Sequence, residues 1–262
     1  MKKATDEHAH EHATHDMGRR DFVILMGSAA AASVFGCGGT SAPTATSIAT
    51  PAPSTAASPL AGATSCAVRP ALTEGPYFVD EKLNRSDIRS DPSTNAVKPG
   101  ATLALAFLVS KVSGSACSAL PNATVDVWHC DALGVYSDAT DPGFGSTKGT
   151  KFLRGFQTTD ANGSAKFTTI WPGWYQGRAV HIHFKIRTTA AGGAVSDFTS
   201  QLFFDDALNA QVFAQAPYSQ KGSTGWMKNA QDGIYTGGGD KLLLKPTQTG
   251  SGYTATFDIG LA

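Results

Sequence analysis

The chain has 262 residues, 41% of them hydrophobic, which is enough to bury a core in one large domain or two small ones. Only 16% of the residues are charged, and 21 Lys and Arg balance 21 Asp and Glu. This balance leaves no basic footprint for nucleic acid, which excludes that class of partner, and no basic block typical of a membrane-surface patch. The 28 Gly and 13 Pro favour short strands and many turns over long helices.

Residues 1–36 are predicted to form an export signal. The pair Arg19-Arg20 stands directly before an uncharged run over residues 22–36, which is too short to span a bilayer but is typical of the hydrophobic region of a signal peptide. The stretch Arg-Arg-Asp-Phe-Val resembles a twin-arginine signal, with Gly18 where Ser or Thr is usual. Residues 34–37 ("VFGC") also resemble a lipobox, so a lipid anchor on Cys37 stays open. We expect the mature protein to be exported, to the periplasm or the cell surface.

A linker is predicted over residues 37–64, which are nearly all Gly, Ala, Ser, Thr and Pro. Such a segment lacks the large hydrophobic residues that offset the entropy of ordering a chain, so we expect a disordered tether. The folded domain is therefore predicted over residues 65–262. Four of the seven histidines precede the linker, in a polar leader, and the domain keeps only His129, His181 and His183.

The domain is predicted to be all-β. Alternation, or a high content of β-branched and apolar residues, predicts strands over 102–110, 123–130, 164–171, 179–186, 199–204 and 253–260. Turn sequences separate them, and "DANG" at 160–163 predicts a β-hairpin. One short helix is expected over 205–215. We predict a β-sandwich of mostly antiparallel strands, with a partly closed barrel as the alternative.

Three cysteines remain in the predicted domain, Cys66, Cys117 and Cys130. An exported chain permits disulfides, but three thiols cannot all pair within one chain, and their spacing excludes a zinc site of the CxxC type. We prefer a Cys66–Cys117 bridge, because Cys130 falls on a predicted strand close to the candidate site described next.

The stretch "GWYQGRAVHIHFKI", residues 173–186, carries a candidate metal site. Residues i and i+2 of a strand point to the same face, so His181 and His183 lie side by side while Ile182 faces the core. A pair of this kind is a common basis for metal binding. Taken alone it is weak evidence, because a strand with a polar edge gives the same pattern.

Two tyrosines strengthen the metal interpretation. Tyr175 follows a Pro-Gly turn six residues before His181 and can fold back over the histidine face, and Tyr136 ends the stretch "VDVWHCDALGVY". A phenol with its usual pKa of ~10 is a poor ligand, but a hard trivalent cation can displace the proton. Two phenolates and one hydroxide neutralise Fe³⁺, which limits the cost of burying the charge. Each tyrosine alone is more often a packed aromatic residue.

Five stretches in order, over residues 74–204, resemble the intradiol ring-cleavage dioxygenases, which are non-haem Fe(III) enzymes acting on catechol and protocatechuate. They are "TEGPYF", "ATVDVWHCDALGVYSD", "FLRGFQTTDANGSAKFTTIWPGWY", "GRAVHIHFKI" and "TSQLFF". The resemblance implies a β-sandwich that holds Fe(III) through Tyr136, Tyr175, His181 and His183. It also implies that Arg178 stabilises charge on the bound substrate and that Gln201 lies near the dioxygen pocket.

The chemistry implied by the resemblance is cleavage of a small aromatic diol by O2 between its two hydroxylated carbons. Tyr175 would be the ligand that leaves and then accepts a substrate proton as a general base, while Arg178 would supply a permanent positive charge. The sequence indicates neither the particular catechol nor the oligomeric state.

Two other functions stay open at the level of sequence. One is a metal-binding or ligand-binding β-sandwich without turnover, since fold alone does not decide function. The other is a carbohydrate-binding surface module in which Trp171 and Trp174 form a stacking platform. Among the remaining candidates, Trp128 and His129 are interpreted as strand packing, and Tyr77 as either a pocket residue or a core residue.

Overall fold

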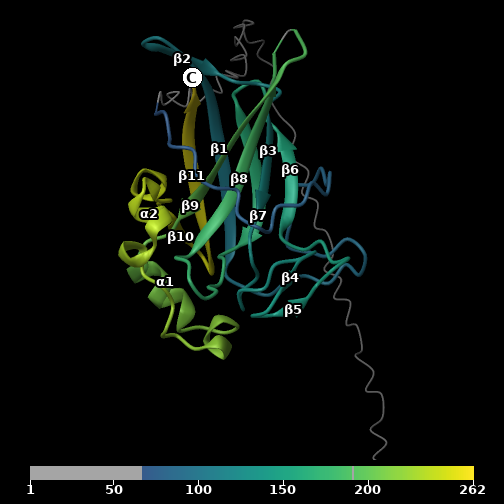
Figure 1. The fold of residues 1–262 in the computed structure, drawn as a ribbon, viewed down its shortest axis with the longest axis vertical. Helices are drawn as coiled ribbons and strands as arrows, with labels where there is room; N and C mark the ends of the chain where they lie inside the picture. Colours follow the sequence, from purple (N-terminus) through teal and green to yellow (C-terminus); the bar gives the residue numbers. More distant parts are fainter. Residues whose placement is uncertain (1–66, 191) are drawn as a thin grey trace, which may run out of the picture. The chain divides into compact units, whose positions relative to one another are not determined.

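Two β-sheets pack against each other in this computed structural model, which describes residues 67–190 and 192–262 (Figure 1). The predicted export signal, the linker, the domain boundary at residue 65, and the residues Cys37 and Cys66 lie outside the described residues. Within the described ranges, no helix has the length and apolar character needed to cross a membrane.

The first sheet has five strands in the order β10–β11–β1–β2, with β7 also paired to β1. Their bounds are β1 (Thr102–Ser113), β2 (Ala116–Ala119), β7 (Ser164–Ile170), β10 (Thr247–Thr249) and β11 (Gly252–Leu261). Strands β1 and β11 pair in parallel, and the other pairs are antiparallel. One edge of β1 is shared, because β7 pairs with its first part and β2 with its last four residues.

The second sheet has four antiparallel strands in the order β6–β3–β8–β9. Their bounds are β3 (Thr124–Trp128), β6 (Arg154–Thr158), β8 (His181–Thr189) and β9 (Val195–Phe203). A separate two-stranded ribbon, β4 (Thr140–Asp141) and β5 (Gly145–Ser146), lies in the loop after β3. The sheet order places β8 between two neighbours, so its position is fixed from both sides.

Short helices fill the long connection between β9 and β10 and lie to one side of the sheets (Figure 1). They are α1 (Asp206–Phe213), η1 (Tyr218–Lys221), η2 (Asn229–Gln231), α2 (Gly233–Thr236) and η3 (Gly239–Leu242). Helix α1 is the one expected over 205–215, and the Asp205 carboxylate caps it by accepting from the N–H groups of Ala207 and Leu208.

All six predicted strands form, and the all-β sandwich of mostly antiparallel strands is confirmed. Strands β2, β4, β5, β6 and β10 were not predicted, because each has at most five residues and its sequence lacks hydrophobic alternation. Strand β9 starts four residues earlier than expected, at Val195, since its first residues extend the pairing with β8 beyond the buried part of the sandwich.

The hairpin predicted at "DANG" is wrong. Strand β6 before the turn pairs with β3, and strand β7 after it pairs with β1, so the turn connects the two sheets. The N–H of Val109 on β1 donates to the carbonyl oxygen of Gly163 at 2.8 Å, and a Cβ on Gly163 would lie 2.2 Å from the Val109 carbonyl oxygen. Because the turn is docked on β1 in this way, the chain after the turn runs beside β1. Strand β7 therefore joins the sheet of β1, whereas β6 belongs to the sheet of β3.

The core lies between the sheets. On β1, Leu103, Leu105, Phe107 and Val109 alternate inward, and from β8 the side chains of Ile182, Phe184 and Ile186 meet them. The rings of Phe107 and Phe184 lie 5.2 Å apart. The first six residues of β8 are all buried, so its other face, which carries the two histidines, is covered as well.

The two described cysteines differ in bonding, as expected. Cys117 is disulfide-bonded, and Cys130 is a buried free thiol whose S–H points to the carbonyl oxygen of Gly173 at 3.5 Å. Burial raises the pKa of Cys130 above its usual value. The expected partner of Cys117, Cys66, lies outside the described residues.

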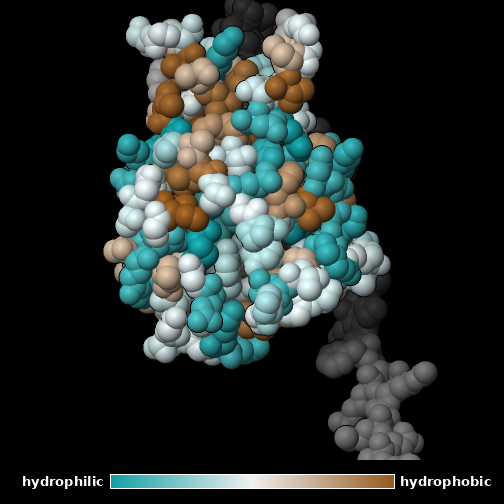
Figure 2. All heavy atoms as spheres, in the orientation of Figure 1, coloured by the Kyte–Doolittle hydropathy of each residue, from teal (hydrophilic) through white to brown (hydrophobic). Residues whose placement is uncertain are grey.

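An apolar groove of about 570 Å³ lies at the end of the sandwich that carries the β8–β9 turn and the C-terminus. Figure 2 shows hydrophobic residues gathered at this end, and Val68, Val195 and Leu261 line the groove. None of the predicted site residues line it. The histidines stand at the opposite end of β8.

A buried hydrogen bond joins the two sheets through His129. Its Nδ1–H donates to the carbonyl oxygen of Cys130 (2.8 Å), which leaves Nε2 to accept from the hydroxyl of Thr169 on β7 (2.6 Å). Burial lowers the pKa of His129 to about 4, so the ring is neutral near pH 7. The interpretation of His129 as a packing residue is confirmed.

We expect Thr169→Val to lower the free energy of unfolding by about 1–3 kcal/mol, since it leaves a buried imidazole nitrogen without a donor. Denaturant unfolding measures the change. Thr168→Val, the same substitution on the half-buried neighbour, is the control and should change stability by much less. Equal effects of the two substitutions would contradict a specific role for the His129–Thr169 bond.

Candidate metal centre

The two histidines of β8 converge at the start of the strand. His181 and His183 are 2% and 1% exposed, and their Nε2 atoms lie 3.0 Å apart. His183 stands opposite Trp128 on β3 and opposite Gln201 on β9, and its ring stacks on that of Trp128 with centroids 5.0 Å apart. The predicted alternation is confirmed, and both imidazoles lie on one face of a strand held on both sides.

Both imidazoles are neutral, which is the form that binds metals. The Nδ1–H of His181 donates to the carbonyl oxygen of Ala179 at 2.6 Å, so Nε2 is left with its lone pair. Burial lowers the pKa of His181 to about 3. Burial, together with the positive charge of Arg178, holds the pKa of His183 well below its usual value.

Tyr175 lies over the histidine pair, as predicted. Its Oη is 3.2 Å from Nε2 of His181, and the two rings meet edge to face. The chain can turn here because Gly173 packs directly on the backbone after β3. The N–H of Gly173 donates to the carbonyl oxygen of Asp131, and a Cβ on Gly173 would lie 2.4 Å from the carbonyl oxygen of Ala132. Burial raises the pKa of Tyr175 to about 12, so without a cation nearby its hydroxyl stays protonated.

Tyr136 brings a second phenol to the site from the loop after β3. Its ring centroid lies 5.6 Å from that of Tyr175 and 6.3 Å from that of His183. Its Oη is buried and has no hydrogen-bond partner among the described residues, and burial raises its pKa well above the usual value. Burying a hydroxyl without a hydrogen-bond partner destabilises the folded state, so binding of a ligand to this oxygen would be favourable.

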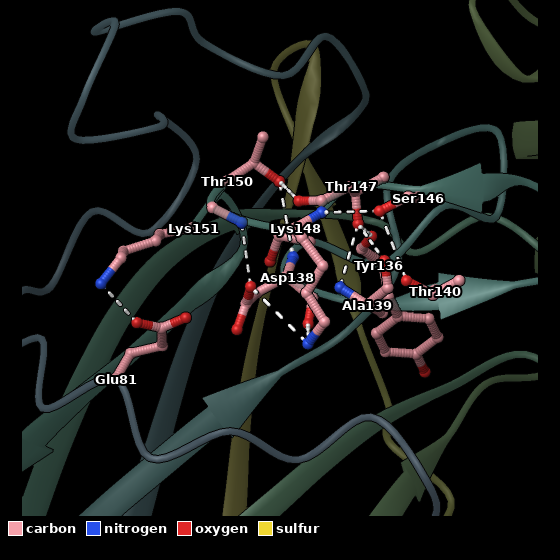
Figure 3. Close-up of polar contacts among 12 residues, drawn as sticks. Glu81, Tyr136, Asp138, Ala139, Thr140, Ser146, Thr147, Lys148, Thr150 and Lys151 are labelled. Carbon is pink, nitrogen blue, oxygen red and sulfur yellow. Dashed lines mark hydrogen bonds and ion pairs between the residues drawn. The ribbon is translucent and has the colours of Figure 1, made fainter.

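The backbone of Tyr136 is fixed by the β4–β5 loop (Figure 3). The hydroxyl of Thr147 donates to the carbonyl oxygen of Tyr136 at 2.7 Å and accepts from the N–H of Ala139 at 3.1 Å. Asp138 extends the network by accepting from the N–H of Gly149. Figure 3 shows the phenol ring pointing away from these contacts, so the loop anchors the residue without engaging its hydroxyl.

These four side chains fit a hard cation. They offer two neutral imidazoles and two phenols, one with an unpartnered oxygen, and no carboxylate takes part. A trivalent ion would lower the pKa of both phenols and turn their oxygens into phenolate ligands. No cluster of three or more His, Cys, Asp or Glu side chains suited to a metal occurs elsewhere in the described part of the chain.

Arg178 is held beside the histidines by two partners. Its Nη2 donates to Oε1 of Gln201 at 2.5 Å, and its Nε donates to Oδ2 of Asp232 at 3.0 Å. Gln201 is held in turn, since its Nε2 donates to the carbonyl oxygen of Thr73 at 2.8 Å. The structure thus brings together two residues predicted for the site from separate motifs, Arg178 and Gln201.

Asp232 is a site residue that sequence reasoning missed. It is 3% exposed, and besides binding Arg178 it accepts from the backbone N–H of Ala179, two residues before His181. It also caps α2 by accepting from the N–H of Ile234. In sequence, an Asp before a Gly indicates a turn or a cap, and no pattern connects it to an arginine 54 residues earlier.

Tyr77 both lines the pocket and packs in the core, so the two interpretations left open are both correct. Its ring stacks on Tyr136 with centroids 4.3 Å apart and meets Tyr175 edge to face at 6.0 Å. Its hydroxyl donates to Oδ2 of Asp141 at 2.6 Å. The hydroxyl of Tyr77 is therefore already engaged by a carboxylate.

The stacking-platform hypothesis for Trp171 and Trp174 is wrong. Trp171 is completely buried, and its Nε1 donates to Oδ1 of Asn209 at 2.9 Å, so its ring cannot meet a glycan. Only Trp174 reaches a cavity. The two rings differ because Trp171 ends the predicted strand facing the core, whereas Trp174 follows the Pro-Gly turn.

A solvent-open cavity of about 860 Å³ extends to Tyr175. Aromatic side chains form much of its wall, and Asp141 and Lys221 are its charged residues; the rings are those of Tyr77, Phe144, Trp174 and Tyr175. A pocket of this kind, with apolar walls and few polar groups, is typical of a small-molecule site. Tyr175 is therefore reachable from solvent, whereas Tyr136 is buried behind it.

A protein-family model described as "Dioxygenase" (Dioxygenase_C) matches residues 73–236. No curated protein matches the chain.

Three dioxygenases are among the solved structures similar to this chain. An intradiol ring-cleavage dioxygenase from Tetranychus urticae is 31% identical, with a TM-score of 0.62 and coverage of 75% of this chain and 94% of that one. The dioxygenase Tetur07g02040 is 30% identical, with a TM-score of 0.64 and coverage of 75% and 94%. The dioxygenase domain of a dioxygenase carbohydrate-binding protein fusion from Streptomyces sp. SirexAA-E is 29% identical, with a TM-score of 0.51 and coverage of 74% and 98%.

The family match spans more than half of the chain and contains every residue of the site, from Thr73 to Asp232. The relative from Tetranychus urticae is covered almost completely. The chain therefore belongs to the intradiol ring-cleavage dioxygenases, a family of oxidoreductases.

Proposed function

We propose that this dioxygenase uses Fe(III) to open the ring of a catechol-type substrate between its two hydroxylated carbons, with insertion of both atoms of O2. The observation that carries the proposal is the convergence of two neutral imidazoles and two phenols, one of which, Tyr175, lines an open cavity. The four donors are Tyr136, Tyr175, His181 and His183. A β-sandwich that only binds a metal is the alternative, and it would take up no oxygen with catechols.

Bound Fe(III) would act as a Lewis acid that receives both oxygens of the diol and draws electron density from its ring. The two tyrosines are suited to different tasks. Tyr136 is 1% exposed and its backbone is anchored by Thr147, so it is placed to remain a ligand. Tyr175 is half-buried on the cavity wall, so it is placed to yield its position and, once ionised, to accept a proton from the entering diol.

Arg178 is placed to stabilise negative charge on the substrate. Its charge lowers the pKa of His181 and opposes the rise in the pKa of Tyr175 that burial causes, so its field reaches the ligands. Asp232 and Gln201 fix the guanidinium before any substrate binds. A charge oriented in advance costs no reorganisation when the anion develops.

The ligand assignment predicts a different loss of iron, colour or rate for each substitution. His181→Ala and His183→Ala should remove most of the iron, because neither neighbouring residue can offer an imidazole on that face. Tyr136→Phe should weaken iron retention and erase most of the visible phenolate-to-iron band. Tyr175→Phe should keep substantial iron while losing rate.

Iron content, the visible spectrum and catechol-dependent oxygen uptake measure these losses. Tyr253→Phe, which removes a phenol on β11, is the matched control and should behave as wild type. Full iron and full activity in either histidine variant would overturn the site.

The Arg178 network predicts an effect on rate alone. Arg178→Ala should leave iron and colour nearly intact and slow turnover roughly 10²–10³-fold, the range for one electrostatic stabiliser. Asp232→Asn should slow turnover less, since the guanidinium remains but loses its charged partner. Loss of iron in Arg178→Ala, or an unchanged rate, would assign Arg178 a structural role instead.

We further propose that the protein is exported and that a lipid on Cys37 anchors it. The support is the sequence before the domain: Arg19-Arg20, the uncharged run that follows, and the lipobox-like "VFGC". The twin-arginine route carries folded proteins, so iron could be loaded before export.

Replacing Arg19 and Arg20 together by Lys should leave the precursor in the cytoplasm. Cell fractionation with an antibody against the domain follows it, and Lys2 and Lys3 replaced by Arg is the matched control, since it keeps the twin pair. Normal export of the doubly substituted Lys variant would rule out the twin-arginine route. Cys37→Ser should release the exported protein from the membrane fraction.

A further inference from the structure

Lys221 bridges the two loops that carry the tyrosines. It ends η1, and its Nζ donates to the carbonyl oxygen of Leu133 at 2.6 Å and to that of Trp174 at 2.7 Å. Leu133 lies three residues before Tyr136, and Trp174 directly precedes Tyr175. One ammonium group therefore holds both tyrosine-bearing segments through charge-assisted hydrogen bonds.

The two loops touch backbone to backbone at this point. Gly134 has a φ of +82°, and a Cβ on it would lie 2.1 Å from the carbonyl oxygen of Trp174 and 2.5 Å from Nζ of Lys221. The N–H of Gly173 donates to the carbonyl oxygen of Asp131 at 3.1 Å. The loops are close enough that a change in the position of one is transmitted to the other.

Lys221 reaches the loops from a fixed base. At the start of η1, Oη of Tyr218 donates to the carbonyl oxygen of Trp171 at 2.7 Å and accepts from the N–H of Ala101 at 3.0 Å. Nζ of Lys221 also lies 4.6 Å from the centroid of the Trp174 ring. The ammonium group is thus located by the anchored start of η1 and by the aromatic ring near it.

We propose that Lys221 is a positioning residue, which clamps these loops together and so sets the separation of the phenol oxygens of Tyr136 and Tyr175. With the Trp174 carbonyl held, Tyr175 can yield its place by rotating its side chain while its backbone stays where it is. The inference rests on the proposed ligand roles of the two tyrosines, but the clamp itself is a property of the chain without metal.

Hydrogen exchange on the metal-free protein tests the clamp directly. Lys221→Met keeps a long apolar side chain and removes the donors, so amide exchange should accelerate in both 131–136 and 173–176. Lys221→Arg keeps donors and charge and should restore part of the protection. Lys228→Met is the matched control, since Lys228 also lies over a tryptophan, Trp226, away from these loops.

The iron-loaded proteins give a second readout. In Lys221→Met the visible band should shift and kcat should fall roughly 10- to 100-fold, with a smaller change in KM, because the ligating oxygens are displaced. The thermal midpoint should change no more than in Lys228→Met. Gly134→Ala, which pushes the same loops apart from the other side, should shift the band as well.

Unchanged exchange in both loops of Lys221→Met would overturn the clamp. So would a loss of rate with an unshifted band, or protection that Lys221→Arg does not restore at all. A wild-type protein that binds no iron and cleaves no catechol would instead overturn the proposed function, and the exchange comparison would still decide the role of Lys221.

Discussion

The whole site depends on one strand that is buried on both faces. Strand β8 lies between β3 and β9, and its residues alternate between the hydrophobic core and a second enclosed space. Ile182 and Phe184 are held by the opposite sheet, which fixes the backbone. The same backbone then presents His181 and His183 side by side on the other face of the strand, where both are buried.

Enclosing polar side chains creates the demand for a cation. Burial keeps both imidazoles neutral and both phenols protonated, and it leaves Oη of Tyr136 without a partner among the described residues. In the protein alone the unpartnered hydroxyl is unfavourable, and neither the imidazoles nor the phenols carry a charge. Under the proposed function, a bound trivalent ion would change this by pairing with phenolates and imidazole lone pairs. The four side chains supply no charge of their own in the protein alone, so the proposed site depends on a bound cation for its charge.

Residues from the last part of the described chain complete the site without adding ligands. Asp232 fixes Arg178, and Lys221 joins the loops of Tyr136 and Tyr175; both lie in the helical connection after β9. This connection acts as a brace, since its contacts go to backbone carbonyls and to one guanidinium. Loops that carry function on a rigid scaffold commonly need such support, because their own hydrogen bonds do not fix them.

The sequence by itself determined the strand periodicity, the side-by-side histidines and the family, because these depend on local spacing and on stretches that stay contiguous. It also identified Tyr136, Tyr175, Arg178 and Gln201 as members of one site, through the resemblance to the family. The tertiary structure decided which sheet each strand joins: "DANG" has the local chemistry of a hairpin, but its docking on β1 sends β7 across the sandwich. It alone revealed Asp232 and Lys221, since a carboxylate and an ammonium acquire their roles from partners 54 and 88 residues away, and no local pattern encodes that distance.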